Sequence, residues 1–297
     1  SNNWNTNAAW VGGSQPTAAD DVVIPAAAVV TIPSATSVVG RSLTVQASGT
    51  LAFAATTSTL SLGNATAGAG NVALSISASA TITLTAIGTI NLVSTSTTQQ
   101  TIDAGGKTLP NITVNGAGSS YILSSALTSS GNLVLNAGTF NANNLAMTLA
   151  TLSVGASGVR TMTLGSSAIT LTGSSSVFSF GNLTNLTFTA NTAVLTITAA
   201  VVSFNNIVVM NSFNWNGLSL VITAAQAATV NISGATIRNL TITGTAIKTT
   251  EFRFNGSFTI TDTLSVVGNS SVNRVLLSTT TRGTAAALTD RKSTRLN

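Results

Sequence analysis

Short runs in which apolar and hydroxyl-bearing residues alternate dominate the chain and constrain its fold more than any other feature. They include Ser42–Val45, Thr59–Leu62, Thr81–Leu84, Asn132–Leu135, Ala193–Thr198 and Leu240–Thr243. A period of two puts aliphatic side chains on one face of a β-strand and hydroxyl groups on the other. The helix formers Glu and Lys are scarce, whereas Thr, Ser, Val and Asn are abundant. The pattern therefore predicts an all-β fold with essentially no helix.

The runs recur along the chain as a loose repeat that ends in a small residue or a glycine. Repeats start at Ile112, Leu133 and Leu152, and again at Leu240 and Leu264. Periods of about 20 to 25 residues, such as these, indicate a solenoid or array. Leucine-rich repeats share the period, but they need a helical segment on the convex side. A pair of β-sandwich domains permits the same alternation, although the repeat unit is too short for one sandwich each.

We therefore predict a single-stranded parallel β-helix (β-solenoid) of roughly 20-residue coils. Glycine and asparagine should occupy the corners, where the backbone needs positive φ. The interior rows should hold Val, Ile and Leu together with Phe178, Phe188, Phe204 and Phe213.

The two ends of the chain differ in composition from its middle. Residues 1–33 contain two tryptophans, a Gly-Gly pair and an Asp-Asp pair, and we expect them to form an N-terminal capping segment. Residues 34–289 form the predicted solenoid. Residues 290–297 change composition abruptly and are predicted to be a non-native tail. Because no charged-then-apolar leader follows Ser1, we expect a mature chain or a fragment.

The composition excludes several classes of protein. The chain is 44% hydrophobic and only 6% charged, the reverse of the disordered pattern. Polar residues interrupt the apolar ones every few positions, so no run reaches the roughly 20 residues of a membrane span. The net charge of +5 comes partly from the C-terminal end of the chain, and the other cations are scattered singly. Nucleic-acid binding needs clustered Lys and Arg, so we expect no nucleic-acid partner.

Two stretches of sequence carry a resemblance. The opening pattern Trp-x5-Trp-x-Gly-Gly-x2-Pro-x3-Asp-Asp-Val-Val-Ile at residues 4–24, with Val29–Ile32 and Ser42–Val45, resembles the N-terminal part of β-helix surface proteins of bacteria and phages. Lys107–Gly116 and Gly131–Phe140 are similar to repeats of phage structural and secreted proteins, including tail-fibre-like and adhesin-like repeats. The resemblance covers most of residues 4–289. It implies a structural or adhesive role and carries over no catalytic residue.

Residues that could perform catalysis are few. The chain has no His and no Cys, which excludes the usual serine and cysteine triads and zinc sites built on those residues. Its carboxylates are Asp20, Asp21, Asp103, Glu251, Asp262 and Asp290. A glycosidase needs two carboxylates that face each other across the sugar bond. The separation of Glu251 and Asp262 in the sequence is not a whole coil. We therefore predict no enzyme and no catalytic, cofactor or metal site.

Other polar features allow two interpretations each. Asp20 and Asp21 could bind calcium, but the next acid in the sequence is as far away as Asp103, which favours turn and cap roles. Trp4, Trp10 and Trp215 could stack on sugars, although burial is favoured for each. The Asn-x-Ser/Thr sequons follow from composition and matter only in a glycosylating host. They lie at Asn64, Asn111, Asn182, Asn185, Asn231, Asn239, Asn255 and Asn269.

Thr-x-Thr runs recur at 81–85, 161–163, 170–172, 187–189, 196–198, 241–243 and 259–263. A flat face of ranked threonines is the kind of surface that binds ice, but threonine is also a common exposed strand residue. The intervals are irregular, since the run that ends at Thr198 is followed by none until Thr241, so we expect no continuous rank.

These features together predict a non-enzymatic extracellular structural or adhesive β-solenoid. It would be a stalk or fibre segment of a bacterial cell surface or phage virion. Partners consistent with this role are a cell-surface or glycan ligand and further copies of the chain. The alternatives are a binding module for ice or carbohydrate and, less favoured, a polysaccharide-degrading β-helix enzyme.

Overall fold

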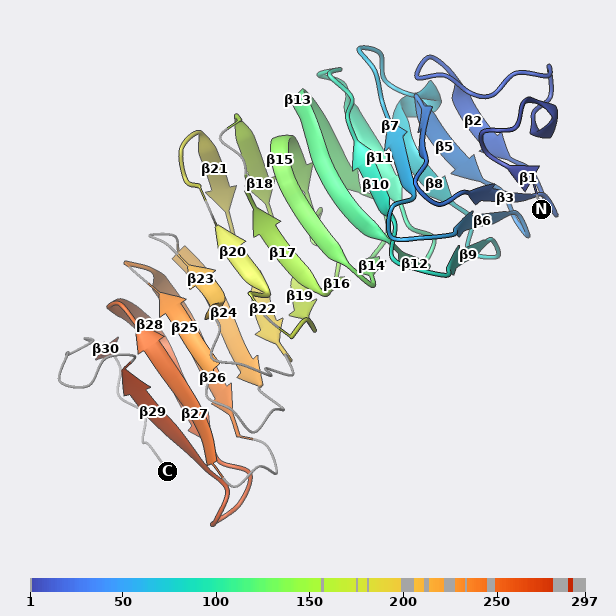
Figure 1. The fold of residues 1–297 in the computed structure, drawn as a ribbon. Helices are drawn as coiled ribbons and strands as arrows, with labels where there is room; N and C mark the ends of the chain where they lie inside the picture. The colour runs from blue at the N-terminus through green and yellow to red at the C-terminus, as the bar shows by residue number, and fades with distance from the viewer. Residues whose placement is uncertain are drawn as a thin grey trace. The chain divides into compact units, whose positions relative to one another are not determined.

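The chain forms an all-β solenoid of about 10 turns of stacked parallel strands, with 56% of residues in strands and 2% helical (Figure 1). This confirms the predicted fold class, and the parallel pairing favours the solenoid over two sandwiches. The structure is a computed structural model. It describes residues 2–155, 158–174, 176–180, 182–198, 206–210, 214–221, 228–232, 234–244, 249–279 and 288–290.

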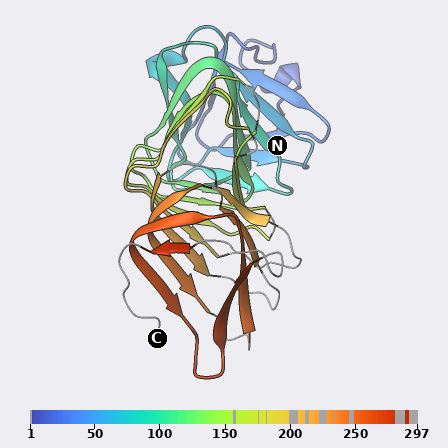
Figure 2. The same ribbon diagram turned by 90° about the vertical axis from the view of Figure 1, so that its left-hand side faces the viewer.

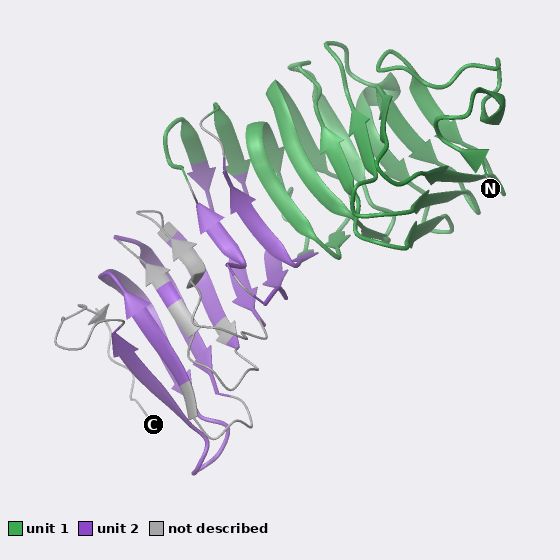
Figure 3. Ribbon diagram, viewed as in Figure 1, with its two compact units in different colours: residues 1–147, 156–162, 182–187 green, residues 148–155, 163–181, 188–297 purple. Residues whose placement is uncertain are grey.

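The chain divides into two compact units (Figure 3). The first unit comprises residues 1–147, 156–162 and 182–187, and the second comprises residues 148–155, 163–181 and 188–297. Strands β16 (Met147–Leu149), β18 (Arg160–Thr163) and β21 (Leu186–Thr189) include residues of both units.

In the first unit each turn supplies three short strands, which run around a shared interior (Figure 2). The first three turns consist of β2 (Asp21–Ile24), β3 (Val29–Ile32) and β4 (Ser37–Gly40), then β5 (Ser42–Val45), β6 (Thr50–Phe53) and β7 (Thr59–Leu62), then β8 (Val72–Ile76), β9 (Thr81–Leu84) and β10 (Thr89–Leu92). The remaining elements are β1 (Asn2–Asn3), η1 (Asn7–Ala9), η2 (Ala69–Asn71), β11 (Gln99–Asp103), β12 (Thr108–Leu109), β13 (Asn111–Leu123), β14 (Leu127–Ser129) and β15 (Asn132–Asn141).

Strand β13 is long because it belongs to two turns. Its first half pairs with β10 and its second half pairs with β11. Strand β1 adds to the outer edge of β3, where Asn2 and Asn3 pair with Val30 and Thr31.

Some coils are longer than predicted, and their length varies from turn to turn. Asp21 pairs with Ser42 in the next turn, whereas Thr50 pairs with Thr81, so the second of these turns takes up about half as much chain again. The longer turn contains the segment between β7 and β8, which includes the short helix η2. The strand register is kept because loops absorb the difference in length.

In the second unit the turns change from three strands to two longer ones. Its strands are β17 (Thr151–Val154), β19 (Ala168–Leu171), β20 (Phe178–Phe180), β22 (Val194–Ile197), β23 (Asn206–Met210), β24 (Asn214–Val221), β25 (Ala228–Ile232), β26 (Thr236–Thr243), β27 (Thr249–Asn255), β28 (Phe258–Val267), β29 (Arg274–Thr279) and β30 (Leu288–Asp290). From β24 onward, even-numbered strands pair with one another in one sheet, and odd-numbered strands from β25 to β29 pair in another.

The interior rows hold the residues that the alternation pointed inward. Ile24, Leu43 and Leu60 are fully buried, and each belongs to a strand with a buried residue at every second position. Among the predicted interior phenylalanines, Phe178 is buried and Phe188 is half-buried. Phe204 and Phe213 lie outside the described residues.

The corners use positive φ, as predicted. Asn143 and Asn144 have φ of 53° and 63°, a region in which asparagine is tolerated. Less expected are Ala27 and Ala35, with φ of 61° and 53°, because alanine gains nothing from its side chain there.

Within the part of the chain that the structure describes, no helix is long and apolar enough to cross a membrane.

Candidate functional site

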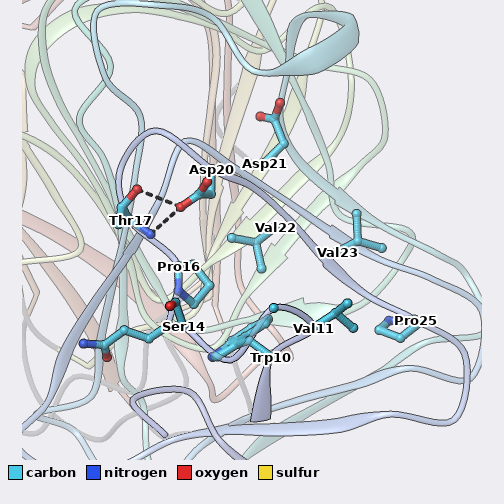
Figure 4. Close-up of a pocket in the computed structure, with 12 residues that line it drawn as sticks. Trp10, Val11, Ser14, Pro16, Thr17, Asp20, Asp21, Val22, Val23 and Pro25 are labelled. Carbon is cyan, nitrogen blue, oxygen red and sulfur yellow. Dashed lines mark hydrogen bonds between the residues drawn. The ribbon is translucent and has the colours of Figure 1, made fainter. Parts of the chain in front are cut away.

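A groove lies at the N-terminal end of the first unit, between the segment 10–17 and strand β2 (Figure 4). Its volume is about 600 Å³, a size typical of ligand pockets. Of its lining residues, Trp10, Val11 and Pro16 belong to the segment 10–17, Val23 belongs to β2, and Pro25 directly follows β2. The Trp10 indole nitrogen donates to the main-chain oxygen of Trp4 at 2.7 Å, and the two rings pack edge to face at 5.0 Å. These contacts of Trp10 with Trp4 fix the position of the segment 10–17, which forms one side of the groove.

The two neighbouring aspartates at this end serve different structural roles. Asp20 Oδ2 accepts hydrogen bonds from the amide and hydroxyl of Thr17 at 2.8 and 2.7 Å, which closes a turn and lowers the pKa of Asp20. Asp21 accepts two bonds from the Arg41 guanidinium, and Ser42 donates to it at 2.6 Å. The Arg41 bonds are the main cause of the lowered pKa of Asp21. The turn interpretation is confirmed for Asp20, whereas Asp21 forms an ion pair that the sequence analysis did not predict.

The other carboxylates with described side chains also have local partners. Asp103 accepts the Gly105 amide at 2.9 Å, and Asp262 accepts from Arg238 at 3.2 Å. Glu251 accepts from Arg253 at 3.0 Å and from Ser278 at 2.7 Å, and these bonds lower its pKa. Asp290 ends β30, and the rest of the predicted tail, residues 291–297, lies outside the described residues. Over the described ranges, no three acidic residues gather as they would around a metal ion.

Hydroxyl-bearing residues form a continuous row in the second unit, although threonines alone do not, as expected from the irregular Thr-x-Thr runs. Thr170, Thr196, Ser219, Thr241 and Ser265 pair in register from β19 to β28. Their intervals in the sequence are unequal, and the loops absorb the irregularity. Thr-x-Thr runs alone do not reveal this row, because Ser219 and Ser265 lie in none of them. All five side chains are half-buried on the outer face, and neighbours in such a row are about 4.8 Å apart.

The first unit carries a second polar row. Ser37, Thr59, Thr89 and Asn111 pair in register across β4, β7, β10 and β13. The adjacent outward positions, two further along these strands, are Val39, Ser61, Asn91 and Thr113. None of these eight side chains is charged, so this face offers an ordered array of small neutral groups.

The tryptophans are mostly interior residues, as favoured by the sequence analysis. Trp4 and Trp215 are 1% and 2% exposed, so neither can offer a ring face to a sugar. Trp215 packs within 5.2 Å of Phe178 and 4.9 Å of Phe188, in an aromatic cluster inside the second unit. Only Trp10 keeps partial exposure.

One arginine, Arg160, is buried, although nothing in the sequence distinguishes it from the other scattered cations. Arg160 is fully buried, and its guanidinium donates to the main-chain oxygens of Gly158, Asn182 and Thr184. Burial lowers its pKa. Because all three acceptors are backbone carbonyls that close corners of neighbouring turns, this side chain acts as a structural clamp.

Several sequon asparagines also serve the fold. The side-chain amide nitrogens of Asn64, Asn111 and Asn239 donate to the main-chain oxygens of Ala18, Gly88 and Asn216. These bonds tie one turn to another, so the asparagines have structural roles that need no glycan.

No protein-family model, curated protein or solved structure matches the chain.

Proposed function

We propose that the chain is a non-enzymatic extracellular structural or adhesive β-solenoid, a stalk or fibre segment of a phage or bacterial surface. The observation that carries this proposal is the repetitive outer surface. Rows of small uncharged residues follow the stacked strands, and each carboxylate with a described side chain is bound by neighbouring groups of the fold. Such a surface suits regular spacing and contact better than chemistry at one point. The resemblance of residues 4–289 to surface proteins of bacteria and phages supports the same role.

Polysaccharide turnover tests the non-enzymatic part of this proposal. The purified chain should release no reducing or unsaturated sugar from a panel of bacterial polysaccharides. A glycosidase would need an acid and a second carboxylate across the sugar. Sustained release that Glu251→Gln or Asp262→Asn abolishes would contradict the proposal and establish the less favoured enzyme.

A whole-cell binding assay tests the adhesive part. Fluorescently labelled chain should bind saturably to intact cells of at least one strain in a panel of bacteria, and an excess of unlabelled chain should displace it. Binding to none of the strains would contradict the adhesive role and leave only that of an inert stalk.

A binding module for ice or carbohydrate is the second candidate, and the continuous row in the second unit favours it. Ordered hydroxyls at about 4.8 Å spacing could match a regular lattice or a polymer. Thermal hysteresis measures binding to ice, and a glycan array measures binding to carbohydrate. The double variant Thr196→Lys/Thr241→Lys should abolish whichever of these two signals the unaltered chain gives. Thr163→Lys, on β18 outside this row, is the matched control. Absence of both signals in the unaltered chain would exclude this candidate.

A further inference from the structure

The outer edge of β2 is an unpaired strand edge. The Ile24 carbonyl accepts the Gln46 amide at 2.9 Å, and the Asp20 carbonyl accepts the Arg41 amide at 2.7 Å. Backbone groups alternate in direction along a strand, so the N–H and C=O groups of Asp21 and Val23 point away from β5. Within the described ranges, β2 pairs with β5 alone and no hydrogen bond reaches these outward backbone groups.

The neighbouring strand shows how this end of the solenoid treats an edge. Strand β1 covers the edge of β3, and the Trp4 amide extends that pairing with a bond to the Thr31 carbonyl at 2.8 Å. The edge of β2 instead faces the groove. An uncovered edge accepts an extended chain readily, since its donors and acceptors are already aligned.

The side chains around this edge are apolar and accessible. Val11 is fully exposed and Val23 is 47% exposed, and both line the groove with Trp10 and Pro16 (Figure 4). Peptides that add to a sheet edge gain affinity from main-chain bonds and specificity from contacts of alternate side chains. The groove offers both kinds of contact.

We propose that this groove binds an extended peptide as an added strand on β2. The peptide backbone bonds to Asp21 and Val23, and Pro25, which has no N–H, ends the usable edge. Its alternate residues are apolar and pack on Trp10 and Pro16. A basic side chain at one end meets Asp20, whose Oδ2 atom accepts both Thr17 bonds and whose Oδ1 atom accepts none from the described residues. This inference does not depend on the proposed structural role.

A peptide fits the groove better than a second copy of the chain. Strand β2 forms one side of the groove and the segment 10–17 forms the other. If two copies paired through β2, the segment 10–17 of each copy would compete with the segment 10–17 of the other copy for the same space. A separate extended segment has no such wall and enters without displacing residues 10–17.

Fluorescence anisotropy with a defined probe tests the proposal. The probe is fluorescein-labelled Lys-Val-Thr-Val-Thr-Val amide, and the full chain should bind it saturably. Val23→Pro removes one outward N–H but leaves the bonds of Val22 and Ile24 to β5, and it should weaken binding at least tenfold. Val39→Pro is the matched control, because Val39 is an outward residue of β4 whose N–H also points away from the paired strand. The affinity of the Val39→Pro variant for the probe should differ from that of the unaltered chain by less than twofold.

Two further arms separate the contributions. Replacing the probe's lysine by norleucine should weaken binding to the unaltered chain but not to Asp20→Asn. A probe methylated on alternate backbone nitrogens should not bind. Absence of saturable binding, or equal effects of the two proline variants at matched melting temperature, would overturn the proposal. Self-association in sedimentation that Val23→Pro abolishes would also overturn it, because the occupant would then be a second copy.

Discussion

The first turn of the first unit and the last described turns of the second unit bury their inward side chains to different extents. At the N-terminal end, Trp4 is 1% exposed and the inward residues of β2 and β3 are at most 4% exposed. Near the other end, Leu264 and Val266 of β28 are only half-buried, although their partners one turn earlier, Leu240 and Ile242, are fully buried. The inward residues of β29, Val275 and Leu277, are also half-buried.

The difference shows what an interior row requires. A side chain in the row is sealed when another layer lies on each side of it, and the described pairing of β28 with β30 covers Phe258–Ile260 but not Leu264 and Val266. At the N-terminal end, residues 2–20 supply such a layer, with Trp4 over the interior and β1 on the edge of β3. The sequence prediction of a cap over residues 1–33 therefore includes β2 and β3, which belong to the stacked strands.

The largest expected effect comes from deletion of residues 1–20, which leaves β2 complete. Loss of this segment uncovers the interior row and the edge of β3, and an uncovered edge templates addition of another chain. The low charge of the chain offers little repulsion. We expect filaments or aggregates in light scattering and negative-stain microscopy.

Deletion of residues 291–297 is the control for this experiment and should leave the chain soluble with an unchanged melting temperature. A monomeric chain without residues 1–20 would show that this segment is no cap. Filaments of the intact chain would instead make this end an assembly surface.

Trp4→Ala and Leu264→Ala compare the two regions at single residues. Removal of a fully buried tryptophan costs about 3–5 kcal/mol of unfolding free energy, because the cavity cannot fill. Leu264 is half-buried, so its truncation should cost at most about 2 kcal/mol. Urea unfolding followed by circular dichroism measures both. A larger loss for Leu264→Ala would mean that the second region is covered in solution.

The strands were the most predictable part of the molecule. The runs Ser42–Val45, Thr59–Leu62 and Thr81–Leu84 are β5, β7 and β9 with identical bounds. Each strand has a local period that sequence displays directly. The register between turns is not local, since the interval between paired positions changes from one turn to the next with the length of the loops. This is why the row through Ser219 could not be predicted.

The candidate groove and the buried arginine were unpredictable for a related reason. A free strand edge depends on where the preceding segment folds, and the alternation in β2 is the same as in covered strands. Arg160 looks like an exposed cation in the sequence, but two of the carbonyls that it binds, those of Asn182 and Thr184, come from a loop one turn later. By contrast, the turn role of Asp20 followed from the preference of Asp for local backbone bonds.

The smallest expected effect concerns acid sensitivity at the two regions. The folded-state pKa values of Asp21 and Glu251 lie below their ordinary values because Arg41 and Arg253 bind them. The stability from these bonds is therefore present above the unfolded-state pKa and is lost as pH falls through the folded-state pKa.

Melting temperatures at pH 7 and pH 3 measure this effect. Asp21→Asn should reduce the acid-induced drop more than Glu251→Gln, since Asp21 accepts bonds from Arg41, Ser42 and the Ala69 amide, whereas Glu251 accepts from Arg253 and Ser278. Partly exposed pairs of this kind contribute about 1 kcal/mol or less. An unchanged drop in both variants would assign the acid sensitivity to other groups.

Chemical cross-linking across the outer row tests the in-register solenoid most directly, because the chain has no natural cysteine. Thr196 and Ser219 are register partners on adjacent strands, so their side chains should lie about 5 Å apart. Thr170 and Ser219 are separated by two strand spacings, about 10 Å. With a thiol-reactive cross-linker that spans one strand spacing but not two, Thr196→Cys with Ser219→Cys should react within the chain, and Thr170→Cys with Ser219→Cys should not. Efficient cross-linking of the second pair, or none of the first, would contradict the stacked register.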